Sequence, residues 1–300
     1  MNYDLITILG CTATGKTKLA VQLADYFNGE IISADSRQVY RGMNIGTGKD
    51  LSEYVINGKS IPYHLIDVID PAGEFNLYSF QQLFYESYNS IKANSHLPFL
   101  VGGTGLYLSS VLQKYNLNKA DFENQKQILS SLSDIELREL LKTLNPILHN
   151  TTDLQERARI IKAISVSRAK QNDIGKQKIN SFTIGVRLSR DEIKKRITSR
   201  LKKRLDEEGM IEEVKSLMDS EISYDKMIFF GLEYKFIAQY LTGELNKNDM
   251  FQKLNSAIHS FSKRQMTWFR KMEKEGVVIN WIDGPDFNKA KELIERNIIN

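Results

Sequence analysis

The residue pattern with the clearest chemical meaning is a glycine loop near the start of the 300-residue chain. It reads Gly10-Cys11-Thr12-Ala13-Thr14-Gly15-Lys16-Thr17, which has the spacing G-x-x-x-x-G-K-[ST]. In such a loop, backbone N–H groups curl around phosphate oxygens at the start of a helix. Lys16 would add a positive charge there, and the Thr17 hydroxyl would face a Mg²⁺ ion. The residues expected to bind phosphate are Gly10, Thr12, Ala13, Thr14, Gly15, Lys16 and Thr17.

This loop predicts a site for a polyphosphorylated ligand but does not specify the reaction. The alternative is a chance glycine turn. The segment before the loop, residues 5–9, is apolar and reads as a strand, and residues 18–24 read as a helix. Because both flanking patterns are those of a phosphate loop, the functional interpretation is favoured.

Asp35 is the next residue that could take part in chemistry. It follows residues 29–34, which read as a buried strand. Ligands of open parallel sheets bind beyond the carboxyl ends of strands, so Asp35 is expected beside the glycine loop. There it could hold a hydrated Mg²⁺ or accept a proton from an incoming nucleophile. Alternatively, it only caps the segment that follows, since Asp-Ser is good capping chemistry.

Two further glycine-rich segments are expected nearby. Residues 41–49 are rich in glycine and contain Lys49, so they could approach an anion or form a plain surface loop. Residues 102–105 follow the apolar segment 97–101 and include Thr104. The Thr104 hydroxyl could donate to a phosphate oxygen at the same sheet edge as Thr17. A simple turn before a helix would explain these glycines but not the hydroxyl.

The elements that position these residues alternate between strand and helix, which predicts an α/β fold with a parallel sheet covered by helices. Residues 117–180 differ, because they are polar and helical with no strand pattern. We therefore expect a P-loop core formed by residues 1–116 and 181–300, and a small inserted all-helical domain at 117–180. The strand at 97–101 ends without the Asp that P-loop kinases usually place there to hold Mg²⁺.

Basic residues concentrate in helical segments. Arg159 and Lys162 lie three apart on one face of the inserted domain, and nine Lys or Arg lie between residues 187 and 204. In residues 259–271, basic side chains alternate with aromatic ones. Such surfaces suit phosphates and unpaired bases, although solvated or docking helices look similar.

The composition is that of an ordinary globular chain. Its formal net charge is +4, and Cys11 is the single cysteine, so an internal disulfide and a cysteine zinc cluster are both excluded. No apolar run approaches the roughly 20 residues needed to cross a bilayer. The N-terminus shows no leader pattern. We expect a cytoplasmic monomer with no membrane anchor.

The chain resembles the tRNA dimethylallyltransferase (isopentenyl-tRNA transferase) family. The matching motifs are spread in family order over nearly the whole chain, which makes them far more specific than the phosphate loop alone. They are residues 10–17, Asp35-Ser36-Arg37-Gln38 continuing to Lys49, His64-Leu65-Ile66-Asp67, residues 100–107, and Lys263-Arg264-Gln265-Met266-Thr267-Trp268-Phe269-Arg270.

The resemblance implies transfer of a dimethylallyl group from dimethylallyl diphosphate, with Mg²⁺, to the N6 amine of the adenosine 3′-adjacent to a tRNA anticodon. The tRNAs would be those that read codons beginning with U. It implies that Lys16 and Thr104 act on the diphosphate, with Thr17 at the metal, and that Asp35 accepts the amine proton. Residues implied to contact tRNA are Asp35, Ser36, Arg37, Gln38, Thr104, Arg157, Arg159, Lys162, Lys263, Arg264 and Gln265.

Several positions depart from the family pattern. Cys11 replaces the usual proline, Ser165 ends a motif that usually ends in Glu, and Ile228 and Leu232 replace an Arg or Gln and a Tyr. The alternatives that remain are an adenylate prenyltransferase, a P-loop small-molecule kinase, and an RNA-binding relative without turnover. The missing strand-end Asp disfavours a kinase, the inserted helices disfavour a free nucleotide acceptor, and the intact set of Asp35, Lys16 and Thr104 disfavours loss of turnover.

Overall fold

A computed structural model describes residues 3–117, 120–146, 154–169, 179–220 and 222–299. The chain separates into two compact units. The larger unit is Met1–Lys114 together with Lys178–Asn300, and the smaller unit is Tyr115–Gln177. Residues 118–119, 147–153 and 170–177 of the smaller unit lie outside the described residues, whereas residue 180, the expected end of the inserted domain, is described.

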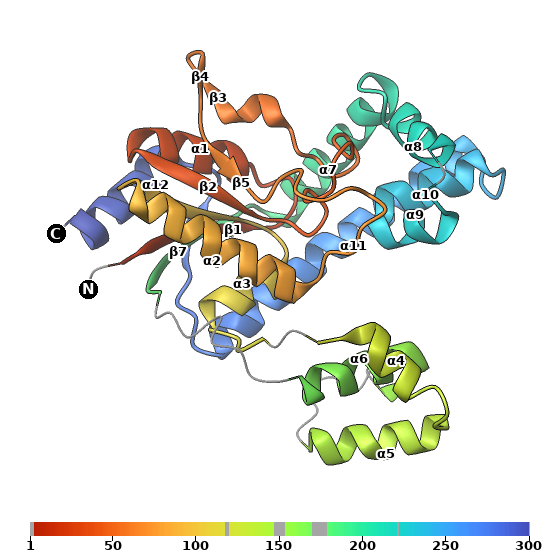
Figure 1. The fold of residues 1–300 in the computed structure, drawn as a ribbon. Coiled ribbons are helices and arrows are strands. Elements are labelled where there is room, and N and C mark those ends of the chain that lie inside the picture. Colours follow the sequence, from red (N-terminus) through yellow and green to blue (C-terminus); the bar gives the residue numbers. More distant parts are fainter. Residues whose placement is uncertain (1–2, 118–119, 147–153, 170–178, 221, 300) are drawn as a thin grey trace. The chain divides into compact units, whose positions relative to one another are not determined.

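The larger unit contains a six-stranded sheet in the order β5-β2-β6-β1-β7-β8, with every neighbouring pair parallel (Figure 1). This confirms the predicted fold class. The last strand, β8, was not predicted, because its four residues, Asn280-Trp281-Ile282-Asp283, form neither an alternating pattern nor a continuous apolar run. The strands are β1 (Leu5–Gly10), β2 (Gly29–Ala34), β5 (Tyr63–His64), β6 (Leu97–Gly102), β7 (Ser181–Arg187) and β8 (Asn280–Asp283).

The central strands are buried on both faces, which is why they read as continuous apolar runs. Ile6 and Ile8 pack in one core with α1 (Lys16–Tyr26) and α12 (Phe287–Ile294). On the opposite side lie α2 (Leu77–Ala93) and α3 (Gly105–Leu112) (Figure 1). A short 3-10 helix, η1 (Leu51–Tyr54), and a two-stranded pair, β3 (Val55–Ile56) with β4 (Lys59–Ser60), complete this part.

Five helices of the larger unit form a second core of their own. Their apolar side chains pack around Tyr40 and Met43, which follow β2. This arrangement brings a basic helix and the long helix α11 to the carboxyl side of the sheet. The five helices are α7 (Arg190–Asp206), α8 (Met210–Asp219), α9 (Tyr224–Phe230), α10 (Leu232–Leu241) and α11 (Lys247–Lys274).

Within its described residues, the smaller unit has the helices α4 (Phe122–Ile128), α5 (Asp134–Leu144) and α6 (Arg157–Arg168) around its own apolar core. Helix α5 begins with a capping box, in which Ser133 and Glu136 exchange hydrogen bonds with each other's backbone. The part of this unit that the structure describes is helical and contains no strand. Across the described chain, no helix combines the length and the apolar character that crossing a membrane requires.

Candidate active site

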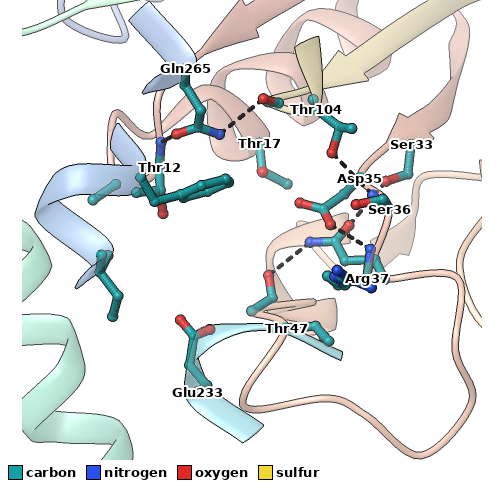
Figure 2. A pocket seen from close by; sticks show the side chains of 18 of the residues that line it. Thr12, Thr17, Ser33, Asp35, Ser36, Arg37, Thr47, Thr104, Glu233 and Gln265 are labelled. Carbon is teal, nitrogen blue, oxygen red and sulfur yellow. Dashed lines mark hydrogen bonds between the residues drawn. The ribbon is translucent and has the colours of Figure 1, made fainter. Parts of the chain in front are cut away.

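A pocket of about 580 Å³ lies at the carboxyl edge of the sheet, where β2, β6 and β1 are neighbours. The loops after these three strands line it with Thr17, Asp35 and Thr104, which lie close together in Figure 2. Glu233 of α10 lies across the opening from them. The parallel topology explains this convergence, because all three strands deliver their following residues to the same edge.

The phosphate loop turns through two left-handed positions, Ala13 at φ 64° and Gly15 at φ 83°. A side chain at Gly15 would also approach Pro285 to 3.1 Å, so glycine is required there on two grounds. Of the residues expected to bind phosphate, Thr12, Ala13, Gly15, Lys16 and Thr17 line the pocket. Gly10 ends β1, and the buried Thr14 hydroxyl donates to the Cys11 carbonyl at 2.9 Å. These two residues shape the loop from behind.

Lys16 and Asp35 face the same cavity. Burial lowers the pKa of Lys16. The nearby Asp35 carboxylate favours the charged form and offsets part of this effect. One Asp35 oxygen accepts the backbone N–H of Arg37 at 2.9 Å, which holds the carboxylate at the end of β2. This bond is a local turn of the capping type, so the structural and functional interpretations of Asp35 are compatible.

Thr104 ties the loop after β6 to the loop after β2. Its hydroxyl oxygen accepts the backbone N–H of Ser36 at 3.1 Å. Because a hydroxyl both accepts and donates, its proton is still available to a ligand oxygen in the pocket.

Gln265 of α11 lines the pocket and joins two of its loops. Its amide nitrogen donates to the Gly103 carbonyl at 2.9 Å, and its amide oxygen accepts the Thr12 N–H at 2.9 Å. The side chain is 7% exposed. Both ends of its amide thus hold the phosphate loop against the Gly103 turn, and the expected contact of Gln265 with RNA stays a prediction.

The segment after Asp35 lies along one wall. Gln38 donates to the Gly48 carbonyl at 3.0 Å and accepts from the Ser33 hydroxyl at 3.0 Å. The Arg37 guanidinium lies 4.9 Å from the centre of the Phe229 ring. Ser36, Arg37 and Gln38 all line the pocket, so the segment is placed where a second substrate would meet Asp35.

The opposite wall carries charged residues that sequence reasoning did not select, namely Arg200, Arg204 and Glu233. Arg200 of α7 donates to the Thr12 hydroxyl, and burial lowers its pKa to about 10. Arg204 pairs with Asp50 at 3.0 Å. Burial raises the pKa of Glu233.

A signal for Arg200 was present in the sequence. Residues 187–204 were recognised as a basic block, and Arg204 shares a buried stripe of α7 with Ile197 and Leu201. Arg200 and Arg204 are four apart, so they lie on one side of the helix. Helical phase therefore points to these two cations within the block.

Segment 41–49 could have brought Lys49 to an anion in the pocket, but Lys49 does not line the pocket. Gly46, Thr47 and Gly48 line the cavity, but the Lys49 side chain is buried away from it. Its ammonium group donates to the Tyr40 carbonyl at 2.6 Å and to Asn44 at 3.1 Å, and it pairs with Asp67. Burial lowers the pKa of Lys49, whereas Asp67 raises it. This buried ion pair fixes the two loops after β2 and β5.

The remaining residues expected to contact RNA are distributed between the units. On α11, Lys263 is exposed, and Arg264 lines the pocket with its guanidinium 5.9 Å from the Phe261 ring centre. In the smaller unit, Lys162 is exposed and Arg159 pairs with Glu156 at 3.5 Å.

Arg157 differs from these residues because its guanidinium is used inside the smaller unit. It pairs with Asp134 at 2.6 Å and donates to the carbonyls of Leu129, Ser130 and Leu132. A residue with four internal partners holds helices together, so its local role is structural.

The departures from the family pattern have simple local environments. Cys11 is 1% exposed and its thiol donates to the Ser262 carbonyl at 3.3 Å, as expected of a small space-filling residue. Ser165 is buried and donates to the Ile161 carbonyl within α6 at 2.7 Å. Leu232 lines the pocket, whereas Ile228 is an exposed residue of α9.

The donor set fits a Mg²⁺ ion that is held mainly by a phosphate ligand. Among the residues that the structure describes, no group of three His, Cys, Asp or Glu side chains could hold a metal by itself. The pocket does contain the Thr17 hydroxyl and the Asp35 carboxylate. Mg²⁺ in phosphate-loop sites is bound by few protein oxygens together with phosphates and water, so this pair is sufficient.

Comparisons with known proteins agree with this geometry. The family model described as IPP transferase matches residues 38–272. The chain is 50% identical to tRNA dimethylallyltransferase 1 of Geotalea uraniireducens, over 100% of this chain and 99% of the relative. It is 48% identical to tRNA dimethylallyltransferase 2 of Phocaeicola vulgatus, over 97% of each.

A solved structure has the same fold. It is the full-length tRNA isopentenylpyrophosphate transferase of Bacillus halodurans, which is 33% identical, has a TM-score of 0.70, and is matched over 98% of this chain and 95% of its own. With a family match over most of the chain and relatives of this identity and coverage, the protein belongs to the IPP transferase family.

Proposed function

We propose that this protein is a tRNA dimethylallyltransferase that prenylates the N6 amine of the adenosine 3′-adjacent to the anticodon. The substrates are tRNAs that read codons beginning with U, and diphosphate is released. The observation that carries the proposal is that a phosphate loop and the Asp35 carboxylate line one pocket in a member of this family. The first holds a diphosphate leaving group, and the second removes a proton from the nucleophile.

The diphosphate of dimethylallyl diphosphate binds at the phosphate loop. Lys16, Arg200 and the loop N–H groups supply positive charge, and Thr104 donates a hydrogen bond from the opposite loop. Negative charge builds on the leaving oxygen as its bond to the dimethylallyl carbon breaks. Donors already fixed in the pocket therefore stabilise the transition state more than the ground state.

Thr17 and Asp35 both belong to the pocket wall. The Thr17 hydroxyl would hold a Mg²⁺ ion, and the Asp35 carboxylate would hold water bound to that ion. When bound, it neutralises charge that develops on the diphosphate. The same Asp35 carboxylate is placed to accept the proton that the adenosine amine loses when it forms its bond to carbon. The acceptor base must leave the anticodon-loop stack to reach that carbon. Ser36, Arg37 and Gln38 form the wall that it meets.

Cations on the surface and at the pocket wall bind the tRNA backbone. We assign Arg159, Lys162, Lys263 and Arg264 to this role, since the first three are exposed and Arg264 lies at the pocket wall. The smaller unit acts as a clamp on the anticodon stem, with Arg157 supporting its helices. We further propose that the protein acts as a monomer in the cytoplasm.

Incubation with radiolabelled dimethylallyl diphosphate, Mg²⁺ and either unmodified tRNA or free AMP tests the proposal, with nucleoside analysis of the product. Label in the tRNA adenosine alone is the expected result, and omission of Mg²⁺ should abolish it. Label in AMP would identify an adenylate prenyltransferase instead. Label in neither acceptor would contradict the proposal and favour an RNA-binding protein without turnover.

A further inference from the structure

An aromatic ring is exposed beside the pocket without being part of its lining. Phe229 lies in the last turn of α9 and is 48% exposed. Its neighbours Phe230 and Gly231 both line the pocket, and Phe229 does not. A phenylalanine in this position is available to a ligand that extends beyond the cavity, such as the larger of the two substrates.

The ring is held in place from behind by a buried aromatic cluster. Phe230 is 1% exposed and packs against Tyr40, with ring centres 5.0 Å apart, and against Tyr234 at 5.9 Å. Phe229 contacts Phe230 at 6.1 Å. Gly231 follows at φ 124° and ψ −165°, a conformation that only glycine adopts readily, and this ends the helix directly after the pair. An exposed ring on a rigid support loses little conformational entropy on binding.

Two cations flank this ring. The Arg37 guanidinium carbon lies 4.9 Å from the ring centre and the Lys226 ammonium nitrogen 5.6 Å from it. Lys226 is itself anchored, because it donates to the Gly73 carbonyl at 3.0 Å. Arg37 is two residues from Asp35 and lines the pocket, so the ring lies beside the segment that presents the proton acceptor.

We propose that Phe229 stacks on an unpaired base of the tRNA anticodon loop next to the modified adenosine, while Arg37 and Lys226 attract the adjoining phosphates. An exposed aromatic ring with flanking cations is the combination that binds single-stranded nucleic acid. This inference rests on the proposed function, since it specifies how the same site holds its RNA substrate. The two cations favour a polyanion over an apolar protein surface.

Binding of an anticodon stem-loop RNA to Phe229→Ala and Phe229→Tyr variants tests the inference. Stacking on an aromatic side chain contributes about 1–3 kcal/mol per base, so Phe229→Ala should weaken RNA binding about 5- to 150-fold. Phe229→Tyr should retain binding within about threefold, since it keeps the ring. The KM for dimethylallyl diphosphate should stay unchanged in both variants, which also reports that the pocket is folded.

Tyr26 provides a matched control. It is 50% exposed and has the Lys291 ammonium nitrogen 4.1 Å from its ring centre, yet it lies in α1 and does not line the pocket. Tyr26→Ala should leave RNA binding unchanged. Equal loss in both alanine variants would show a nonspecific effect of removing a surface aromatic and would overturn the inference.

A second experiment identifies the contact as stacking. Stem-loop RNAs with an abasic site at each loop position beside the acceptor adenosine are compared on wild type and on Phe229→Ala. At one position, the abasic RNA should bind wild type more weakly than the intact RNA does. At the same position, Phe229→Ala should bind the abasic and the intact RNA equally. If Phe229→Leu restores binding as well as Phe229→Tyr, or if no position shows this coupling, the stacking assignment is wrong.

The controls separate this inference from the proposed function. If the wild-type protein prenylates tRNA but Phe229→Ala binds the stem-loop as tightly as wild type, only the stacking role fails. If the wild-type protein transfers no label to tRNA, the proposed function itself fails.

Discussion

Among individual residues, Asp35 has the surroundings that catalysis of this kind needs. Three other carboxylates line the pocket, but Asp50 is paired with Arg204, and burial raises the pKa values of Glu53 and Glu233. Asp35 lies beside Lys16, which it stabilises as a cation. Its place at the end of β2 is held by the backbone rather than by a side-chain partner. The carboxylate is therefore free to play the part proposed for it, which is to accept a proton from the substrate.

Replacing this carboxylate should reduce turnover much more than binding. Asp35→Asn should lower kcat by about 10²- to 10⁴-fold, the usual contribution of a general base, and leave both KM values within a few fold. Glu233→Gln makes the same chemical change across the pocket and should stay within about tenfold of wild type. Steady-state kinetics with tRNA and dimethylallyl diphosphate measure both. A rise in KM for tRNA with preserved kcat would reassign Asp35 to binding.

At the scale of elements, the site depends on how α11 holds two loops that precede α1 and α3. Gln265 makes both connections through one amide group. Because the loops come from different strands, their separation is not determined by the sheet alone. Helix α11 therefore shapes the proposed diphosphate site by holding these two loops in place.

Removal of this connection should affect both stability and donor binding. Gln265→Leu leaves the Thr12 N–H and the Gly103 carbonyl without their partner, at about 1–3 kcal/mol for each buried group. We expect a lower melting temperature and a higher KM for dimethylallyl diphosphate, measured by calorimetry and kinetics. Lys263→Ala on the same helix is the control, since Lys263 is exposed, and it should change neither quantity. If Gln265→Leu changes only the KM for tRNA, the residue contacts RNA after all.

The smaller unit separates two kinds of basic residue. Arg157 has internal partners, whereas Lys162 on the same helix is exposed. Arg157→Ala should increase protease cleavage and hydrogen exchange within residues 115–177, because it leaves several carbonyls unpaired. Lys162→Ala should leave both unchanged, weaken tRNA binding, and reduce the salt dependence of binding by about one phosphate contact. The opposite pattern would exchange the two roles.

Considered as a whole molecule, the larger unit also has a charged cluster away from its pocket. Glu30 of β2 is 7% exposed and makes hydrogen bonds of 2.6 Å to His64 and to His96. Burial raises the pKa of Glu30, but the hydrogen bonds from His96 and His64 outweigh burial, so its pKa lies below the ordinary value of 4.5. The cluster joins three segments of the sheet and thus bears on folding rather than on chemistry.

This cluster predicts how stability changes with acid. A carboxyl group whose pKa is depressed by folding adds stability above its unfolded pKa, and that stability is lost as pH falls through the lower folded value. Glu30→Gln should therefore lower the free energy of unfolding at pH 7 by about 1–3 kcal/mol. The difference in the free energy of unfolding between wild type and Glu30→Gln should shrink as the pH falls below about 4.5, as measured by urea denaturation. A difference that stays constant from pH 7 to pH 3 would contradict the assignment.

Local patterns were sufficient for the central strands of the sheet and for the residues at its carboxyl edge. The apolar runs at β1, β2 and β6 and the glycines after them predicted a parallel sheet and placed Lys16, Asp35 and Thr104 together, because parallel strands deliver their ends to one side. The motifs also indicated the family, which the comparisons confirmed. The short strand β8 and the pairing of β3 with β4 were beyond such patterns, since their few residues carry almost no periodicity.

Tertiary packing decided which charged side chains reach the pocket. Arg200 contacts Thr12 across 188 positions of sequence, and Gln265 contacts the same residue across 253. Lys49 and Arg157 are basic residues of motifs that resemble ligand sites, yet Lys49 is buried against Asp67 and Arg157 is held by Asp134 and by backbone carbonyls of its own unit. A sequence pattern determines backbone conformation over a few residues. The partner that each charge finds depends on helices and loops brought together only by the folded core.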